Sequence, residues 1–553
     1  MSSLFAVTFS WLELLRQYVV AHLAVWARWL VLSQQQELRV GYIEIEEPDG
    51  NVITRGTKSP PPPPKHVHTH TNGDTAAAGT TQSLERLEGR LKIHSNTAWL
   101  RLLLFGSLGL AEAYMAGEVD SPDLTAFLTI MLLAENRAAT AWTKQTAYDA
   151  FFRWSVVSMG PALLLRKAHD VATARLNAVR HYSLSNAVFA AFLDETMTYS
   201  CPLWRDPKGG PSFAMTTEAE GESLEKKETT IVNGGHYDAE KEKKEDDKDD
   251  TLEEAQKRKL RFIVRAARIK PTDHVLEIGG GWGSFALLAA RETGCRVTTI
   301  TPSEEQASLI RERVAASSLS PGQVQVLVCD YREVMPALSA ATATTTRTAA
   351  GKTTKPTTTK KFDKIVSIEM LEHVGHECFE TYFRCVDRYL TDAPGGIAVF
   401  QSITMSDAHY EAYLRGGDDF IRRHVFPGGE LPSVAALVEG VRRGSRGRLV
   451  VEDVTSVGAH YARALRCWRG RFLGRFEGVI VPELRRLGAR GKEGSSGMTG
   501  KGGVMTKEEI EVFRRKWVYY FASCEAAFRT KSIGDVIITV GRDGCVEFLE
   551  DSL

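Results

Sequence analysis

The sequence predicts an α/β fold in which helices cover both faces of a mostly parallel sheet. From about residue 258 onward, short β-branched runs alternate with helical or turn-rich sequence, as parallel strands and their crossover helices do. These runs are "HVLEIG", "CRVTTIT", "VQVLVCD", "FDKIVSIE" and "GIAVFQSI". A glycine cluster directly follows the first run and opens a helix. The tail, "IGDVIITVGRDGCVEFLE", is typical of an antiparallel hairpin that turns at Asp543-Gly544.

Length and composition limit the classes of protein to consider. A chain of 553 residues is too long for one ordinary core, so we expect two folded parts joined by linkers. The 69 basic and 69 acidic residues cancel, which argues against a nucleic-acid partner. The 8 cysteines contain no C-x-x-C pair, so we expect neither a metal site nor disulfides. Reduced thiols favour a cytoplasmic location.

Residues 1–35 form an apolar, aromatic segment that we expect to be a helix. Glu13, Arg16 and Arg28 interrupt it before about 20 apolar residues accumulate, so it makes a poor transmembrane helix. Its mixture of Trp, Leu and Arg suits a helix that lies at a membrane interface. A packing helix or an organelle presequence fits the same residues, and these alternatives stay open.

Residues 36–150 are expected to form a small α+β domain. Its strands come from "VGYIEIEEPDGNVITRGT", which alternates apolar and polar residues and turns at Asp49-Gly50. Its helices come from "WLRLLLFGSLGLAEAYMAGEVDSPDLTAFLTIML". A Pro, His and Thr-rich insertion at about 56–84 cannot bury a core, so we expect a solvated, disordered loop there.

Residues 151–553 make up the larger domain. Two low-complexity segments interrupt it, a mixed-charge run at about 206–252 and a Thr, Ala and Lys-rich run at about 336–361. Strand and helix signals resume after each segment. Both are therefore predicted to be flexible surface insertions rather than domain boundaries.

The glycine cluster predicts a ligand of nucleotide type. Gly279, Gly281 and Gly283 lie between a strand and a helix, where missing side chains let a ligand approach free N–H groups. Glu277 would repel a pyrophosphate but can accept from an ammonium group, and the second strand ends in "TITPSEEQ" without the lone acid that grips an NAD ribose. Asp330 closes the third strand, where it can meet an adenine amino group. These residues favour S-adenosylmethionine over a dinucleotide and predict a Rossmann-like class I methyltransferase fold.

Six ordered blocks carry a resemblance to a known family. They are "RHYSLSNAVFAAFLDETMTYSCPLW", "LEIGGGWG", "IEMLEHVGHE", "DDFIRRHVFPGGELPS", "HYARALRCWRGRF" and "YYFASCEAAFRTKSIGD". In this order they resemble the cyclopropane-fatty-acyl-phospholipid synthase family, to which mycolic acid cyclopropane synthases are similar. The resemblance implies transfer of a methyl group from S-adenosylmethionine to the double bond of an unsaturated acyl chain in a phospholipid. The resulting carbocation must lose a proton to close the ring, so a base in a dry cavity is needed.

The resemblance also implies roles for particular residues. That base is thought to be a bound bicarbonate, and the matching positions that would hold it are Cys201, Glu372, Gln401, Ile403 and Tyr461. The positions that would contact the methyl donor beside the glycine loop and on its ribose side are Tyr199, Ser200, Thr301 and Gln306. Cys524 matches a position regarded as an active-site cysteine, although the mechanism needs no thiol nucleophile.

Several of these positions have structural alternatives. Glu372 can cap a helix, Tyr461 can be a packed aromatic with a bonded hydroxyl, and Cys524 can pack on a buried helix. Gln401 stands where some members have histidine, which replaces a titrating group by a neutral amide. Ser183 and Pro302 depart from the family pattern and put fine contacts in doubt.

The predicted function is therefore a peripheral, membrane-surface cyclopropane-fatty-acyl-phospholipid synthase that acts on unsaturated phospholipid and binds no nucleic acid. A related lipid methyltransferase is the first alternative, giving a methyl-branched or methylene fatty acid or a C-methylated sphingolipid. A non-catalytic lipid-binding module is the alternative from another class, although Glu372 and the glycines are retained. Acyl length, head group and assembly, including a homodimer, stay open.

Overall fold

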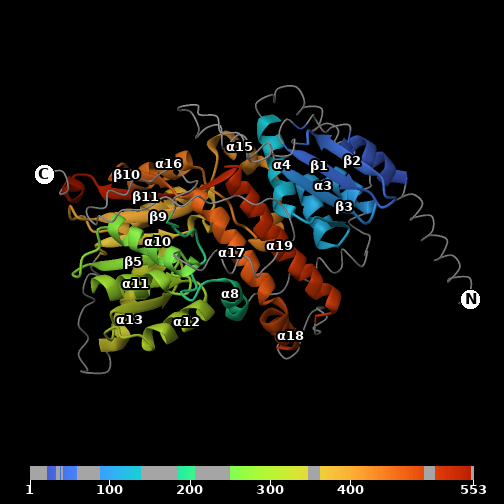
Figure 1. Cartoon of the computed structure of the whole chain (residues 1–553). Helices are drawn as coiled ribbons and strands as arrows, with labels where there is room; N and C mark the ends of the chain where they lie inside the picture. Colours follow the sequence, from blue (N-terminus) through green and yellow to red (C-terminus); the bar gives the residue numbers. More distant parts are fainter. Residues whose placement is uncertain are drawn as a thin grey trace, which may run out of the picture.

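The computed structural model describes residues 22–32, 38, 41–58, 87–138, 185–205, 250–346, 361–490 and 505–549. These residues form a smaller N-terminal domain and a larger domain (Figure 1). The two domains meet where α19 (Lys507–Arg529) of the larger domain packs against α3 (Thr97–Met115) and α4 (Leu124–Ala138) of the smaller one. Most of the three predicted insertions, the whole of 139–184 and the predicted domain boundary near residue 150 lie outside the described residues.

The N-terminal domain packs helices on a four-stranded sheet of order β2-β1-β3-β4. Its elements are β1 (Tyr42–Glu46), β2 (Val52–Gly56), β3 (Glu88–Ile93), α3 (Thr97–Met115), β4 (Val119–Asp120) and α4 (Leu124–Ala138). The turn predicted at Asp49-Gly50 is confirmed, because β1 and β2 pair as an antiparallel hairpin and Gly50 takes the left-handed φ of 82°. Buried residues alternate along β3, so one sheet face meets the helices.

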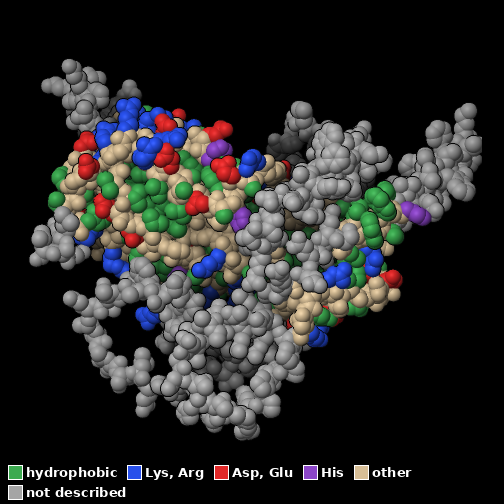
Figure 2. All heavy atoms as spheres, turned by 90° about the horizontal axis from the view of Figure 1, so that it is seen from above, with side chains coloured by type: hydrophobic (Ala, Val, Ile, Leu, Met, Phe, Trp, Pro, Cys, Tyr) green, Lys and Arg blue, Asp and Glu red, His purple; other side chains and the backbone are tan. Residues whose placement is uncertain are grey.

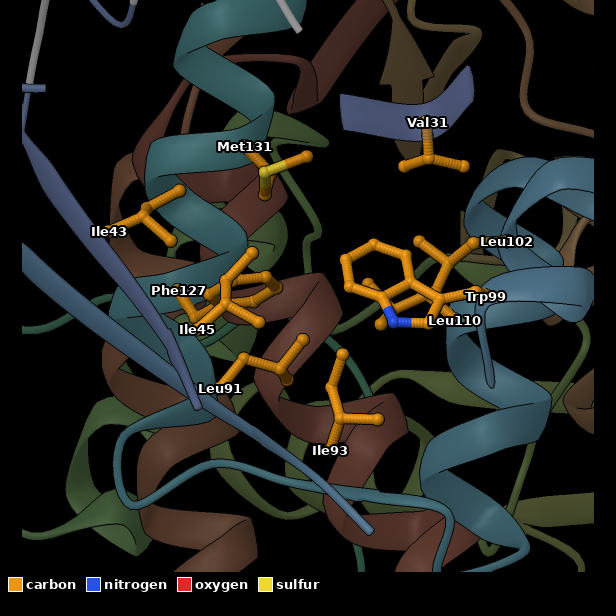
Figure 3. A pocket seen from close by; sticks show the side chains of 10 residues that line it. All are labelled: Val31, Ile43, Ile45, Leu91, Ile93, Trp99, Leu102, Leu110, Phe127 and Met131. Atoms are coloured by element: carbon orange, nitrogen blue, oxygen red, sulfur yellow. The ribbon is translucent and has the colours of Figure 1, made fainter. Parts of the chain in front are cut away.

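A small cavity lies in the core of this domain (Figure 3). Apolar side chains from the helix at 22–32, β1, β3, α3 and α4 surround it, among them Val31, Trp99 and Met131. Its volume of about 30 Å³ is enough for only about one water molecule. The cavity is therefore a packing gap rather than a site for an acyl chain.

The larger domain is built on a seven-stranded sheet of order β10-β11-β9-β8-β5-β6-β7. The strands are β5 (His274–Ile278), β6 (Arg296–Thr301), β7 (Val324–Val328), β8 (Lys364–Ile368), β9 (Ile397–Met405), β10 (Leu449–Ser456) and β11 (Ile533–Arg542). Strands β5 to β9 pair in parallel, and β11 runs antiparallel between β9 and β10. All five predicted parallel strands are confirmed, and the arrangement is that of a class I S-adenosylmethionine-dependent methyltransferase.

Helices cover both faces of this sheet. In chain order, the helices of the larger domain are α8 (Asn186–Phe192), α10 (Leu252–Ala266), α11 (Ser284–Thr293), α12 (Glu304–Ala315), α13 (Val334–Thr346), α14 (Phe379–Tyr389), α15 (Asp407–Arg415), α16 (Val434–Ser445), α17 (Tyr461–Gly474), α18 (Val481–Arg490) and α19 (Lys507–Arg529). Two hydrophobic clusters result, one that includes Leu260 and Phe285 and another that includes Phe383 and Leu437. This confirms the two-sided burial that the apolar strands predict.

Helix α19 joins the two domains, and Figure 1 shows it running between them. Its Arg515 donates to the backbone carbonyl of Val119 at 2.6 Å. Its Glu525 is 1% exposed and accepts from Thr125 of α4 at 3.3 Å, while Arg469 of α17 donates to the same threonine at 2.6 Å. A buried carboxylate with these partners fixes the orientation of the small domain relative to the larger domain.

Two predictions about the fold are wrong, one for the C-terminal tail and one for the start of an insertion. The tail does not form a hairpin after Asp543-Gly544, because β11 finds its antiparallel partners in β9 and β10 and the chain then turns into the short helix η8 (Val546–Leu549). The insertion predicted from about residue 336 begins later, because α13 continues to Thr346. Its Ala-rich composition supports a helix even where polar residues suggest a loop.

Candidate active site

The glycine loop lies at the carboxyl end of β5, the edge where open parallel sheets bind ligands. Gly279, Gly281 and Gly283 have φ values of 87°, 51° and 86°, which explains why glycine occupies each position. Gly280 approaches the neighbouring strand so closely that a Cβ atom would lie 2.0 Å from Thr299 Oγ1. The backbone N–H groups of Gly279 and Gly280 donate to the Ile300 carbonyl at 3.1 and 2.9 Å, which ties the loop to β6.

The predicted donor-binding acids and hydroxyls gather at the same edge. Glu277 is buried, burial raises its pKa to about 8, and its Oε2 atom has no hydrogen-bond partner among the described residues. Thr301 ends β6 and donates to Gln306 at 2.6 Å. These groups fit a polar ligand that carries its own donors, since a bare buried carboxylate oxygen otherwise costs stability.

Asp330 lies just after β7, as the sequence predicts, but it has an arginine partner that the sequence did not indicate. Its carboxylate accepts from the Nε of Arg332 at 2.6 Å and from the Arg332 backbone N–H at 2.9 Å. The guanidinium therefore lowers the pKa of Asp330. A contact between Asp330 and an adenine amino group stays a prediction, and it requires the carboxylate to share its oxygens with Arg332.

Tyr199, Ser200 and Cys201 lie on an irregular segment that follows α8 and precedes α10 in the chain. The Tyr199 hydroxyl is 2.8 Å from that of Tyr520, and the Ser200 hydroxyl accepts from Lys259 Nζ at 2.6 Å. Burial raises the pKa of the Cys201 thiol well above its usual range, so this thiol stays protonated. The segment contributes backbone N–H groups and hydroxyls rather than a thiolate.

Three of the residues predicted to hold bicarbonate converge on a carboxylate of the chain itself, that of Glu369. The Cys201 backbone N–H donates to Glu369 Oε1 at 2.7 Å, and Gln401 Nε2 donates to the same oxygen at 3.0 Å. The Tyr461 hydroxyl donates to Oε2 at 2.7 Å. The oxygens of Glu369 thus accept the hydrogen bonds that the resemblance assigns to bicarbonate. Because these donors are already used, the site does not fit a bound bicarbonate at the same place.

Glu372 and Ile403 meet beside this group. The Ile403 backbone N–H donates to Glu372 Oε1 at 2.5 Å, while Glu372 Oε2 has no partner among the described residues. Burial and the neighbouring Glu369 raise the pKa of Glu372 to about 8. Because its carboxyl group bonds to strand β9 rather than to the first turn of its own short helix η3 (Leu371–His373), Glu372 is not merely a helix cap.

Asp535 and Lys259 complete the site, and sequence reasoning missed both together with Glu369. Asp535 on β11 is fully buried, accepts from Gln401 Nε2 at 3.3 Å, and has a pKa raised well above its usual range by burial and by Glu369. Lys259 on α10 is also fully buried, and burial lowers its pKa. Two buried carboxyl groups, Glu372 and Asp535, and the half-buried Glu369 therefore gather near one buried amine, which favours protonation of some of these carboxyl groups.

Cys524 lies on α19, and burial raises the pKa of its thiol to about 12. It lies near the aromatic side chains of Tyr199 and Tyr520. A neutral thiol in this position supports packing, and a chemical role for Cys524 stays a prediction.

Comparisons with known proteins place this chain among similar sequences. A family model described as mycolic acid cyclopropane synthetase matches residues 169–227 and 242–484. A tuberculostearic acid methyltransferase of Mycobacterium tuberculosis is 30% identical over 79% of this chain and 80% of its own length. A cyclopropane-fatty-acyl-phospholipid synthase of Escherichia coli is 26% identical over 80% of this chain and 85% of its own.

Among solved structures, a mycolic acid cyclopropane synthase complexed with SAH and CTAB aligns with a TM-score of 0.43 and 24% identity. That alignment covers 66% of this chain and 98% of the other.

Proposed function

Since this chain belongs to the mycolic acid cyclopropane synthetase family, we propose that it closes a cyclopropane ring on an unsaturated acyl chain of a membrane phospholipid. It is an S-adenosylmethionine-dependent lipid methyltransferase, as the family and the fold show. The buried carboxyl cluster beside the donor loop is the observation that carries the proposal. Ring closure needs a base that works without water, and two buried carboxyl groups and the half-buried Glu369 lie at this position.

The methyl donor supplies an electrophilic methyl group at the sheet edge. The glycine loop leaves room for its backbone approach, and Glu277, Thr301 and Gln306 would hold its polar groups. Aromatic side chains around Tyr199, including Phe189 and Trp468, make an apolar wall next to the loop. Such a wall suits a hydrocarbon acceptor and excludes water from the carbocation.

Transfer of labelled methyl groups tests the proposal. Purified protein with labelled S-adenosylmethionine and vesicles of unsaturated phospholipid is expected to give labelled fatty acids without the original double bond. A product that keeps its unsaturation indicates the related methyl-branching or methylene-forming reaction instead. Absence of label in any lipid would contradict both.

We further propose that the helix at residues 22–32 contacts the membrane. Among the described residues no helix combines the length and apolar character needed to cross a bilayer. This helix buries Ala24 and Ala27 against the domain but exposes Val25 by 66%, Trp26 by 57% and Trp29 by 61%. Figure 2 shows hydrophobic side chains both near one end of the molecule and over the broad face of its larger part. Exposed tryptophans on one helix face are typical of an interfacial contact.

Substitution of both tryptophans tests the membrane contact. The Trp26→Ala/Trp29→Ala protein is expected to bind phospholipid vesicles about tenfold more weakly or worse, because two interfacial aromatics contribute at least about 1.4 kcal/mol. Its activity on detergent-dispersed phospholipid is expected to stay unchanged. The matched control, Val450→Ala/Val454→Ala, removes exposed apolar side chains from strand β10 and should bind vesicles like the original protein. Equal vesicle binding by both variants would contradict the proposed contact.

A further inference from the structure

We propose that the Glu369 carboxylate, rather than a bound bicarbonate, is the base that takes the proton during ring closure. Its oxygens accept from a backbone N–H, an amide and a phenol that belong to Cys201, Gln401 and Tyr461. A carboxylate and a bicarbonate share the same planar O–C–O group, so a site built for one satisfies the other. In this chain the carboxylate is covalently attached. The inference rests on the proposed function.

The backbone conformation at Glu369 indicates that the fold holds this side chain in a defined position. Glu369 has a φ of 47°, in the left-handed region that a side-chain-bearing residue rarely adopts. Its N–H donates to the Gln401 carbonyl at 2.8 Å, which fixes this conformation at the end of β8. Strain of about 1 kcal/mol persists only where the surroundings determine the geometry, and such positions cluster at functional sites.

Burial raises the pKa of Glu369, and its hydrogen bonds and the nearby Lys259 oppose that rise and favour Glu369 as the anion of the cluster. It accepts from two side chains and one backbone N–H, whereas Glu372 accepts from the Ile403 N–H at one oxygen. Asp535 is held next to Glu369 as the protonated partner, and Lys259 supplies the nearby positive charge. An anion stabilised by several hydrogen bonds in a dry site is a base that keeps its position when the cation forms.

With Glu369 as the proton acceptor, methyl transfer and ring closure balance in atoms and electrons. The alkene π electrons form a bond to the methyl carbon while the carbon–sulfur bond breaks and leaves its electron pair on sulfur. The acyl carbocation then loses a proton from the transferred carbon to the Glu369 carboxylate. The electrons of that carbon–hydrogen bond form the last bond of the ring, and Glu369 ends the step as a neutral carboxylic acid.

Activity with and without bicarbonate tests the inference on the full chain. In buffer freed of carbon dioxide, the original protein is expected to methylate unsaturated phospholipid as fast as with added bicarbonate. Glu369→Gln is expected to lose at least about a hundredfold in rate, because an amide cannot accept the proton. Binding of S-adenosylhomocysteine, measured by calorimetry, should change by less than about threefold.

A second variant checks the shape of the site. Glu369→Gly fits the left-handed backbone and frees the donors of Cys201, Gln401 and Tyr461. We expect its activity to be low and to be restored at least severalfold by added bicarbonate or formate. Glu377→Gln, at an exposed carboxyl group nearby in the chain, is the control and should keep full activity.

Two results would overturn the inference. One is a rate of the original protein that depends on added bicarbonate, and the other is a Glu369→Gln protein that turns over like the original. In both cases lipid is still labelled, so the proposed function survives. If the original protein labels no lipid even with bicarbonate present, the proposed function itself fails.

Discussion

Replacing Gly280 by valine is expected to abolish donor binding and, with it, all lipid methylation. A Cβ atom at this position would lie 2.0 Å from Thr299 Oγ1 and 3.3 Å from Glu277 Oε2. Because Thr299 belongs to the buried middle of β6, the loop rather than the strand must move. Calorimetric titration with S-adenosylmethionine should show a loss of at least about a hundredfold, which equals about 2.7 kcal/mol.

A glycine elsewhere in the same domain provides the control. Gly474 at the end of α17 has no atom within 4 Å of the place where its Cβ would lie, and its φ is not in the left-handed region. Gly474→Val is therefore expected to bind the donor like the original protein. If Gly280→Val also bound it normally, the loop would not be the donor site.

Tyr461→Phe is expected to slow ring closure by about ten- to a hundredfold while donor binding stays intact. The lost hydroxyl donates to Glu369 at 2.7 Å, and a hydrogen bond to a charged group contributes about 1.5–3 kcal/mol. Burial and the negative charge of Glu369 raise the pKa of Tyr461 well above its usual range, so the phenol is a neutral donor. Phenylalanine keeps the stacking on Phe528, whose ring centroid lies 4.3 Å away.

The pH dependence separates this role from a purely structural one. Burial raises the pKa of Glu369 and the hydrogen bond from Tyr461 opposes that rise, so removal of the hydroxyl should raise the pKa further. Because the base works only when deprotonated, the limb of the rate profile that rises with pH should move to higher pH in Tyr461→Phe. A lower rate with an unshifted profile would contradict a direct contact between this phenol and the base.

The sequence predicts much of the scaffold because local patterns determine it. The parallel strands follow from apolar runs, and the hairpin at Gly50 and the loop at Gly279 follow from glycines that need a positive φ. The partners of β11 could not be predicted in this way. Strand pairing between distant segments depends on the whole sheet, and the tail binds strands that precede it by many residues.

Only part of the site could be predicted, because its residues come together through long-range folding. Cys201, Gln401 and Tyr461 were identified through the family resemblance, and the structure brings them together around one point. Glu369 lies within the quoted block "IEMLEHVGHE", three residues before Glu372, and the glutamate at a strand end was the available signal. Lys259 gave none, because a lysine within "QKRKLRF" resembles a solvated helix face until its burial is known.

Transfer of a trideuteromethyl group tests the central claim most directly. The purified protein is incubated with the deuterated donor and unsaturated phospholipid vesicles in buffer without bicarbonate, and the released fatty acids are examined by mass spectrometry. Ring closure by a base of the chain predicts a product that has lost the double bond and keeps two of the three deuterium atoms. A product that keeps all three, one that retains an olefin, or no labelled lipid at all would contradict the account.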